Sequence, residues 1–336
     1  MDYKQSGVDI EAGNEVVRRI RGLARATFTP GVLSDLGSFG GLFTLAPSGF
    51  RDPVLVASAD GVGTKLRVAF MSGVHDTVGV DLVNHCVNDI LVQGARPLFF
   101  LDYLATGRLE PDVAVRIVDG LARACRDNGC ALLGGETAEM PGFYGDGEYD
   151  LAGFIIGAVE RDRIIDGRGI VAGDVVIGLP SSGLHTNGYS LARRIVFDRL
   201  ALGVNDYVPE LGCTVGDALL APHRSYLPVI GPLLDGGTIK GMAHITGGGI
   251  TDNLPRILPE GTSAAIRLTS WPVPPVFRWL QDQGVVPEAE MLRTFNMGVG
   301  MIVVGGAADA EKIRRALPDA VVIGGIEPGD RTVRYV

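Results

Sequence analysis

Residues 79–104 constrain the fold of this chain most, because they read as one continuous helix–turn–strand unit. Apolar residues recur there at helical spacing, namely Leu82, Val83, Cys86, Val87, Ile90 and Leu91. Gly94 ends the predicted helix and Pro97 prevents it from resuming. The apolar run from Leu98 to Leu101 then predicts a buried strand.

The same helix carries Asp81, His85 and Asp89, each four residues after the last. Residues at this spacing lie along one face of a helix. Two carboxylates aligned on a well-packed helix either meet solvent or hold a cation, and the spacing alone leaves both open. For His85, a position on the helix face without a ligand is the favoured interpretation.

The length of 336 residues predicts about two domains of roughly 150 residues each. We place the boundary near residue 165, because residues 161–169 are polar and rich in turn formers. The predicted domains are therefore residues 1–165 and 166–336.

Charge and composition exclude several classes of partner. The net charge of −9 argues against nucleic acid as the main partner, since phosphate backbones need a basic surface. Apolar runs stay well below the roughly 18 residues that span a bilayer, and the first residues do not resemble a signal peptide. The four cysteines form no CxxC pair and read as reduced thiols. A cytoplasmic protein without membrane contact is expected.

Acidic residues next to glycine turns predict a cation site in the first domain. Asp60 opens the turn Asp60-Gly61-Val62-Gly63-Thr64-Lys65 after a strand predicted over Pro53–Ser58. Glu136 follows Gly134 and Gly135 at the end of a second short strand. With Asp89 these acids supply oxygen ligands, which suit Mg²⁺ better than zinc. For the Asp60 turn, an ordinary turn is equally favoured, and the turn is not a Walker A loop.

Three further loops are candidates for ligand contact. Pro180 to Ser190, which contains His185, and Thr246 to Gly249 both lead into predicted helices, where backbone N–H groups favour anions. Thr27 to Phe43 is rich in glycine and proline, and a lid over a site and a disordered arm are equally consistent with it.

The segment Asp89-x-x-x-x-Gly94-Ala95-x-Pro97 resembles the nucleotide-binding signature of one ATP-binding superfamily. Its members include aminoimidazole ribonucleotide synthetase, phosphoribosylformylglycinamidine synthetase and selenophosphate synthetase. The similarity is greatest to the phosphoribosylformylglycinamidine cyclo-ligases. It extends over nearly the whole chain, through the Asp60 turn, residues 134–142, residues 181–190, residues 246–249 and residues 293–301.

This resemblance implies the reaction and the fold. ATP phosphorylates the formyl oxygen of formylglycinamidine ribonucleotide, and the amidine-side nitrogen then closes the imidazole ring as phosphate leaves. The cofactors implied are ATP and Mg²⁺. The fold implied is two mixed α/β domains, with the N-terminal sheets of two subunits pairing across a homodimer.

The resemblance also assigns roles residue by residue. Nucleotide contacts are implied for Phe39, Gly40, Gly41, Asp60, Gly61, Thr64, Lys65, Asp89, Gly94, Ala95 and Glu136. Metal contacts are implied for Asp60, Asp89 and Glu136. Substrate contacts are implied for Ser182, His185, Asn187, Ser190, Thr246, Gly247 and Gly248. Catalytic roles are implied for His185, Asp89 and Arg21, with His185 as an acid/base or as a stabiliser of developing negative charge.

Two features bear on rival interpretations. Arg21 stands where relatives carry lysine, and a guanidinium keeps the charge but does not give up a proton. Selenophosphate synthetases use a reactive cysteine or selenocysteine near the N-terminus, and residues 1–50 contain no cysteine. A homologue without catalysis would be expected to lose the acids or the His185 loop, and the chain keeps both.

Overall fold

The computed structural model describes residues 9–37, 40–317 and 319–336. The chain divides into two compact units, which are described separately here. Unit 1 takes Met1–Ile90 and Ala95–Arg161, and unit 2 takes Leu91–Gly94 and Asp162–Val336. This division falls close to the boundary that the sequence predicts at residue 165.

Unit 1 is built on a four-stranded sheet with the strand order β1-β4-β2-β3. Its strands are β1 (Pro53–Gly61), β2 (Arg96–Thr106), β3 (Ala131–Glu139) and β4 (Tyr149–Glu160). The pairs β1–β4 and β2–β4 are antiparallel, while β2–β3 is parallel. The parallel pair is joined by a crossover helix, as parallel strands require.

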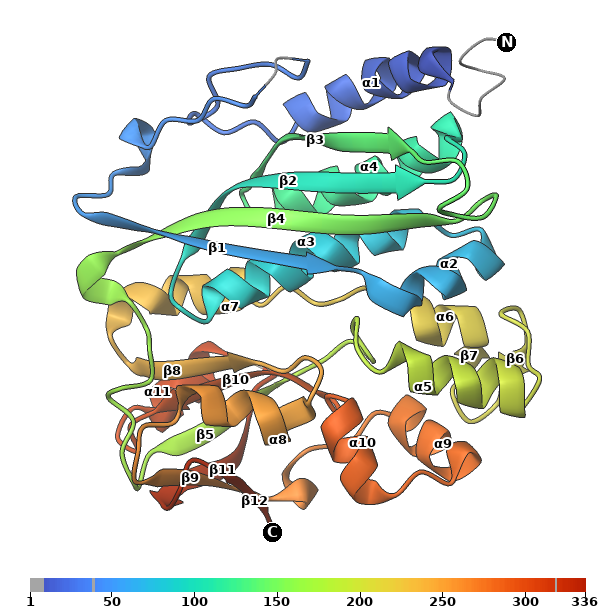
Figure 1. The fold of residues 1–336 in the computed structure, drawn as a ribbon. Coiled ribbons are helices and arrows are strands. Elements are labelled where there is room, and N and C mark those ends of the chain that lie inside the picture. The colour runs from blue at the N-terminus through green and yellow to red at the C-terminus, as the bar shows by residue number, and fades with distance from the viewer. Residues whose placement is uncertain (1–8, 38–39, 318) are drawn as a thin grey trace. The chain divides into compact units, whose positions relative to one another are not determined.

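The helices of unit 1 lie mainly on one face of this sheet (Figure 1). They are α1 (Ile10–Arg25), α2 (Leu66–Ser72), α3 (Asp76–Leu91) and α4 (Pro111–Asp127), with the turns η1 (Ala46–Ser48), η2 (Gly63–Lys65) and η3 (Arg161–Arg163). Helices α3 and α4 approach closely at Gly79 and Gly120, where a Cβ on either residue would meet backbone of the other helix. Glycine is therefore needed at this crossing.

A buried ion pair connects the segment after β1 to α3. Lys65 and Asp81 are both fully buried, and the Lys65 Nζ lies 2.8 Å from the Asp81 Oδ2. Burial lowers the pKa of Lys65, and the charge and hydrogen bond of Asp81 act in the opposite direction. The pair therefore holds the segment after β1 against α3.

The predicted helices over Glu11–Arg25 and Asp112–Asp127 are confirmed as α1 and α4. Two predicted strand ends are wrong, because β1 runs on to Gly61 and β3 runs on to Glu139. Asp60 and Glu136 therefore lie within strands and not in turns. The glycine before Glu136 does not break β3, since Gly135 stays in register with Asp102 and a Cβ there would meet the Asp102 carboxylate.

Unit 2 is built on a six-stranded sheet with the order β12-β9-β11-β5-β10-β8. Its strands are β5 (Val175–Pro180), β8 (Ile239–His244), β9 (Thr262–Ile266), β10 (Val299–Gly305), β11 (Val321–Pro328) and β12 (Val333–Tyr335). All neighbours are antiparallel except β12 and β9. A separate short hairpin pairs β6 (Tyr207–Val208) with β7 (Cys213–Thr214).

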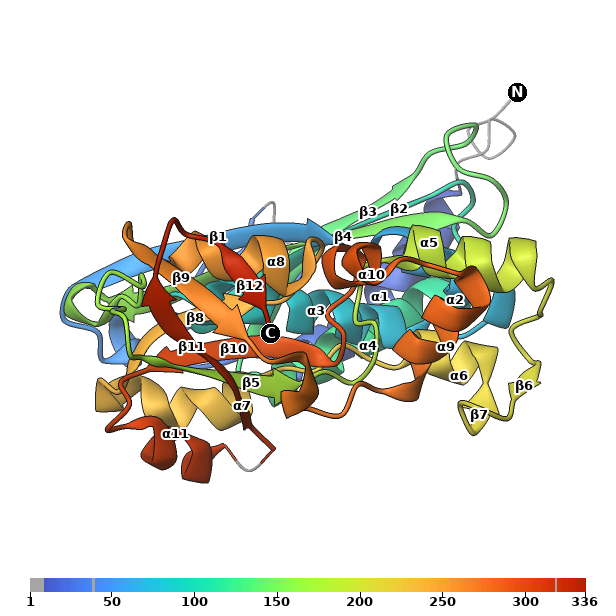
Figure 2. The same cartoon turned by 90° about the horizontal axis from the view of Figure 1, so that it is seen from below.

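Strand β10 shows how this sheet separates two hydrophobic cores. Ile302 and Val304 pack into one core, while Met301 and Val303 pack into the other, as the alternation of side chains along a strand requires. Figure 2 shows α8 (Gly249–Asn253) on one side of the sheet and α7 (Leu227–Ile230) and α11 (Ala310–Ala316) on the other.

The remaining helices of unit 2 are short. They are α5 (Tyr189–Arg193), the π-helical segment η4 (Arg194–Arg199), α6 (Val215–Leu220), η5 (Gly231–Gly236), η6 (Leu254–Ile257), η7 (Leu268–Ser270), α9 (Pro275–Gly284) and α10 (Glu288–Thr294). The single helix predicted over Leu191–Leu200 is thus α5 continued by a π-helix. The prediction of two α/β units is confirmed. Within the described ranges, no helix is long and apolar enough to cross a bilayer.

The ion pair in unit 1 gives a stability prediction. Lys65→Met leaves the Asp81 carboxylate buried without its cation, so we expect a loss of about 3–5 kcal/mol in the free energy of unfolding. Urea denaturation measures this. As a control, Arg161→Met removes the exposed Arg161–Asp52 pair and is expected to cost less than about 1 kcal/mol. Equal losses in the two variants would contradict the buried-pair account.

Candidate functional site

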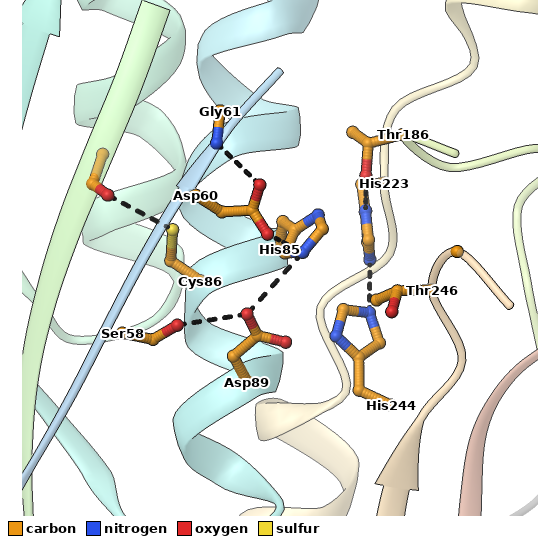
Figure 3. A network of polar contacts seen from close by, with 12 residues as sticks. Ser58, Asp60, Gly61, His85, Cys86, Asp89, Thr186, His223, His244 and Thr246 are labelled. Carbon is orange, nitrogen blue, oxygen red and sulfur yellow. Dashed lines mark hydrogen bonds and ion pairs between the residues drawn. The ribbon is translucent and has the colours of Figure 1, made fainter. Parts of the chain in front are cut away.

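Two acids predicted as cation ligands lie together in unit 1. His85 on α3 stands between them, with its Nε2 2.8 Å from the Asp60 Oδ2 and 3.6 Å from the Asp89 Oδ2 (Figure 3). The Ser58 hydroxyl donates to the Asp89 Oδ2 at 3.2 Å, and the Gly61 N–H donates to the Asp60 Oδ1 at 2.7 Å. The structure thus brings Asp60 and Asp89 close together, and their role as metal ligands stays a prediction. The sequence did not predict that His85 stands between them.

The acids of this cluster change the pKa of His85. Burial lowers the pKa of His85, but the hydrogen bond to Asp60 and the negative charges of Asp89 and Asp81 outweigh burial, so the pKa is raised. The side chains of Asp60 and Asp89 are 41% and 24% exposed, whereas that of His85 is 5% exposed. The carboxylates therefore stay accessible to a ligand while the imidazole does not.

Glu136, the third predicted metal ligand, is not part of this cluster. In the sheet register, Asp60 pairs with Gly153, whereas Glu136 belongs to the next row with Tyr103. Neighbouring rows point to opposite faces of a sheet. The structure therefore does not bring Glu136 to Asp60 and Asp89 within unit 1, and the metal contact expected of each of the three acids stays a prediction.

Glu136 instead lines a pocket of about 640 Å³ in unit 1, a size that accommodates a nucleotide. Gly40 and Gly41, both predicted nucleotide contacts, line the same pocket, as do apolar residues of α1. Asp102 also faces it. Burial raises the pKa of Asp102 to about 7, and the nearby charge of Glu136 adds to that rise. Phe39, the remaining predicted loop contact, lies outside the described residues.

Arg21 lies on the exposed side of α1, next to residues that line this pocket. Its guanidinium approaches Gly37, and its charge helps to lower the pKa of Asp35, after the larger effect of the hydrogen bond from Arg25. Both Gly37 and Asp35 line the pocket. Arg21 can thus meet an anionic ligand there but does not contact the acidic cluster of Asp60 and Asp89.

The other predicted nucleotide contacts of unit 1 differ in accessibility. Gly61 ends β1, and Thr64 and Lys65 follow in η2. The Lys65 ammonium is buried against Asp81, so the structure does not place it where an exposed phosphate could reach it. A phosphate contact by Lys65 would require this ion pair to break.

Gly94 and Ala95 shape the turn that ends α3. Gly94 has φ of +81°, and the Ala95 N–H donates to the Ile90 carbonyl at 3.3 Å. Ala95 is fully buried. Glycine permits the left-handed backbone, and Ala95 packs inside, so this part of the signature maintains the direction of β2 and does not itself offer a ligand surface.

In unit 2, the loop after β5 holds His185 in an unusual conformation. His185 has φ of +62°, which few residues other than glycine adopt, and its side chain is buried. The Ser182 N–H donates to the His185 Nε2 at 3.2 Å. Asn296 stabilises the same loop, because its amide donates to the Gly183 carbonyl at 2.9 Å.

Two further buried histidines adjoin His185. The His223 ring stacks on the His185 ring with centroids 3.9 Å apart. The His223 Nδ1 contacts the Thr186 hydroxyl at 3.3 Å, and its Nε2 lies 3.0 Å from the His244 Nε2 (Figure 3). Sequence reasoning missed His223, because it stands alone between a proline and an arginine.

The second glycine loop lies beside the first. The Asn187 Oδ1 lies 3.2 Å from the position of a Cβ on Gly247, so the two loops are in close contact here. The Asn187 Nδ2 is buried and makes no hydrogen bond to the described part of the chain. The Asn253 amide donates to the carbonyls of Thr246, Gly247 and Gly249, at 3.4, 3.1 and 2.9 Å, and so shapes the loop.

The structure thus brings Asn187 next to Gly247, with Thr246 and Gly248 in the same loop. Ser182 and Ser190 are more exposed and lie at the two ends of the His185 loop. The Asn187 amide donor next to a glycine-rich turn is the arrangement expected of a small polar substrate site.

Comparison with known families matches both halves of the chain. Residues 50–159 match the N-terminal domain of AIR synthase related proteins, and residues 171–336 match their C-terminal domain.

Sequence relatives include two phosphoribosylformylglycinamidine cyclo-ligases. That of Trichlorobacter lovleyi is 58% identical over 311 residues, covering 93% of this chain and 89% of that protein. That of Syntrophotalea carbinolica is 54% identical over an alignment of 344 positions, covering 100% of this chain and 98% of that protein.

Similar solved structures include the hydrogenase maturation protein HypE in complex with ATP, with a TM-score of 0.68 and 19% identity over 95% of this chain and 90% of that one. Thiamine-monophosphate kinase from Stenotrophomonas maltophilia has a TM-score of 0.68 and 18% identity over 94% of this chain and 95% of that one. At this identity the two similarities show a shared fold.

The packing around His185 gives a prediction. A Cβ on Gly300 of β10 would meet the Tyr226 hydroxyl and lie 2.5 Å from the His185 Cε1. We expect Gly300→Ala to lower the free energy of unfolding by about 1–3 kcal/mol through overpacking. The control is Gly169→Ala, where a Cβ meets nothing within 4 Å. Equal unfolding midpoints for the two variants would contradict this packing.

Proposed function

Since this chain belongs to the AIR synthase related family, we propose that it closes the imidazole ring of formylglycinamidine ribonucleotide at the expense of ATP. The product is 5-aminoimidazole ribonucleotide, a step of purine biosynthesis. The observation that supports this most is 54% identity to a cyclo-ligase across 100% of the chain. The activity fits a cytoplasmic enzyme with a small-molecule substrate and no nucleic-acid partner.

The chemistry explains why ATP is needed. The formyl oxygen attacks the γ-phosphorus and ADP leaves. The formamide nitrogen gives up its proton as the C=N bond forms, so the formyl carbon becomes the carbon of an iminophosphate. The amidine-side nitrogen then forms a C–N bond to that carbon while the C–O bond breaks, so phosphate leaves in place of hydroxide. The attacking nitrogen gives up one proton. The protein must position the reactants and stabilise the charge on the moving phosphoryl group.

In this proposal, unit 1 binds the nucleotide. The pocket lined by Gly40, Gly41 and Glu136 has room for it, and Arg21, next to residues that line the pocket, offers a fixed positive charge. Asp60 and Asp89, with the Ser58 hydroxyl beside them, offer oxygen donors that fit Mg²⁺, next to the buried His85 ring that stands between the two carboxylates. A metal held there would neutralise phosphate charge. Because Asp60 and Glu136 point to opposite faces of the sheet, the proposal treats this cluster and the Glu136 pocket as separate ligand contacts of unit 1.

Unit 2 binds the formylglycinamidine ribonucleotide in the same proposal. The buried Asn187 amide offers a donor to the substrate, and the backbone of Thr246, Gly247 and Gly248 lies next to it. Ser182 and Ser190 add hydroxyl groups at the loop ends. His185 supplies the group nearest to these loops that can stabilise negative charge or transfer a proton.

We further propose a homodimer formed through the open face of the unit 1 sheet. Leu55 of β1 and Phe154 of β4 are 59% and 44% exposed. Ala57 and Ala59 expose the same face of β1. An apolar sheet face of this kind is typical of a subunit interface.

The function is tested by measuring ADP release from Mg²⁺-ATP with and without formylglycinamidine ribonucleotide, while the aminoimidazole product is assayed in parallel. The proposal expects ADP release that depends on substrate and equals product formed. ADP release without product, or with a thiamine phosphate as the required acceptor, would contradict it and favour a sister activity on the same fold.

Asp89 gives the first prediction from this function. Asp89→Asn removes one carboxylate charge and keeps the side-chain volume, so we expect kcat to fall by about a hundredfold or more through lost metal and phosphate contacts. Steady-state ADP release measures the effect, and circular dichroism checks the fold. Asp119→Asn, on the exposed face of α4, is the matched control and should retain wild-type kcat. Full activity of Asp89→Asn would remove it from the site.

The dimer gives the second prediction. Phe154→Asp places a charge at the centre of the apolar sheet face, and we expect it to shift the protein from dimer to monomer. Analytical ultracentrifugation measures the mass. Phe143→Asp changes another exposed phenylalanine, 80% exposed in the loop between β3 and β4, and should leave the mass unchanged. A wild-type protein that sediments as a monomer would overturn the proposed interface.

A further inference from the structure

His185 is restricted to one orientation by its backbone and by one hydrogen bond. Its φ of +62° sets the direction in which the side chain projects from the loop. The Ser182 N–H points at its Nε2 at 3.2 Å, and a backbone N–H can only donate. The Nε2 must therefore be the unprotonated nitrogen, so a neutral His185 carries its proton on Nδ1.

This tautomer decides what His185 can do. A ring with Nε2 already accepting a hydrogen bond and Nδ1 already protonated is a neutral hydrogen-bond donor. Such a donor stabilises an oxygen on which negative charge develops. To accept a proton, the ring would have to give up the bond from Ser182. Of the two roles that the family resemblance leaves open for His185, the geometry favours the donor.

The orientation of the His185 ring depends on His223. The two rings are stacked, with an interplanar angle of 20° and a centroid separation of 3.9 Å. His223 is 1% exposed, and both of its nitrogens are engaged, one with Thr186 and the other with His244. Because His223 is held at both ends, it presents a fixed flat surface to His185.

Gly300 and Tyr226 also restrict the His185 ring. Gly300 on β10 and Tyr226 before α7 pack against His185, and there is no room for even a Cβ on Gly300. The Tyr226 hydroxyl donates to the Pro180 carbonyl at 2.9 Å, which holds the tyrosine in place. His185 can therefore turn only if His223 moves.

A metal ion is a second explanation for three buried histidines. Nitrogens of His185, His223 and His244 lie within 4.8 Å of one another. A metal lies close to the plane of each imidazole that binds it, however, and two nearly parallel rings stacked 3.9 Å apart cannot both point at one ion. The Nε2 atoms of His223 and His244, 3.0 Å apart, fit one shared proton instead.

We propose that His223 is a positioning residue for the ring-closure reaction. It fixes His185 by ring stacking so that the His185 Nδ1–H meets the oxygen on which charge develops. This inference rests on the proposed function. Loss of His223 should lower kcat more than it changes KM, because a misplaced donor stabilises the transition state less and leaves substrate binding largely intact.

The first test compares His223→Ala with His223→Gln. Alanine removes the ring and both hydrogen bonds, whereas glutamine keeps a polar side chain that reaches toward His244 but has no ring. We expect kcat for product formation to fall about tenfold or more in both variants, with KM for ATP and substrate within about twofold of wild type. Imidazole in the buffer should restore part of the activity of His223→Ala only.

The matched control is His75→Ala in unit 1. His75 is also buried and hydrogen bonded, to the Tyr149 hydroxyl at 2.9 Å, but it lies outside the proposed machinery. It should lose stability without losing kcat. An equal loss of kcat in His75→Ala, an unchanged kcat in His223→Ala, or full activity of His223→Gln would each overturn the role of the stacked ring.

Nitrogen-15 NMR of the wild-type protein tests the tautomer without any variant. The proposal expects the His185 Nε2 to show the chemical shift of an unprotonated nitrogen and Nδ1 that of a protonated one. The reverse assignment would overturn the inference. A wild-type protein that makes no aminoimidazole product would instead contradict the proposed function, so the two failures are distinguishable.

Discussion

The buried ion pair between Lys65 and Asp81 determines the geometry of unit 1. Lys65 ends η2, the turn after β1, and Asp81 lies in the first half of α3, so the pair holds this turn against that helix. His85 and Asp89 follow Asp81 at one and two helical turns, which places both beside Asp60. The accessible carboxylates therefore depend on an interaction that is itself wholly inside the protein.

In unit 2, the packing holds the imidazole of His185 in a fixed orientation. His185 occupies a left-handed backbone position and is enclosed by His223, Tyr226 and Gly300. Asn253 and Asn296 satisfy the carbonyl groups of the surrounding loops. Polar side chains thus bind the backbone of the loops that the sequence marks as ligand sites, Asn253 from the following helix and Asn296 from a distant position in the chain.

The sequence predicts the helix–turn–strand unit around Asp89 well, because helical periodicity, Gly94 and Pro97 all agree there. It predicts Asp60 and Glu136 as turn residues, and both lie in strands, since a glycine beside an acid reads as a turn even when the sheet needs the missing Cβ. Sheet register then separates Glu136 from Asp60 and Asp89. The stack of His185 and His223 depends on tertiary packing, which local spacing does not encode.

The claim at the centre of this account is that Asp60 and Asp89 hold the divalent metal that the ATP-dependent reaction uses. Electron paramagnetic resonance of Mn²⁺ with ATP, in the wild-type protein and in Asp60→Asn/Asp89→Asn, tests it most directly. The account predicts an ATP-dependent bound-Mn²⁺ signal in the wild type that is lost in the folded double variant. An unchanged bound signal in that variant would contradict it and place the metal on other residues.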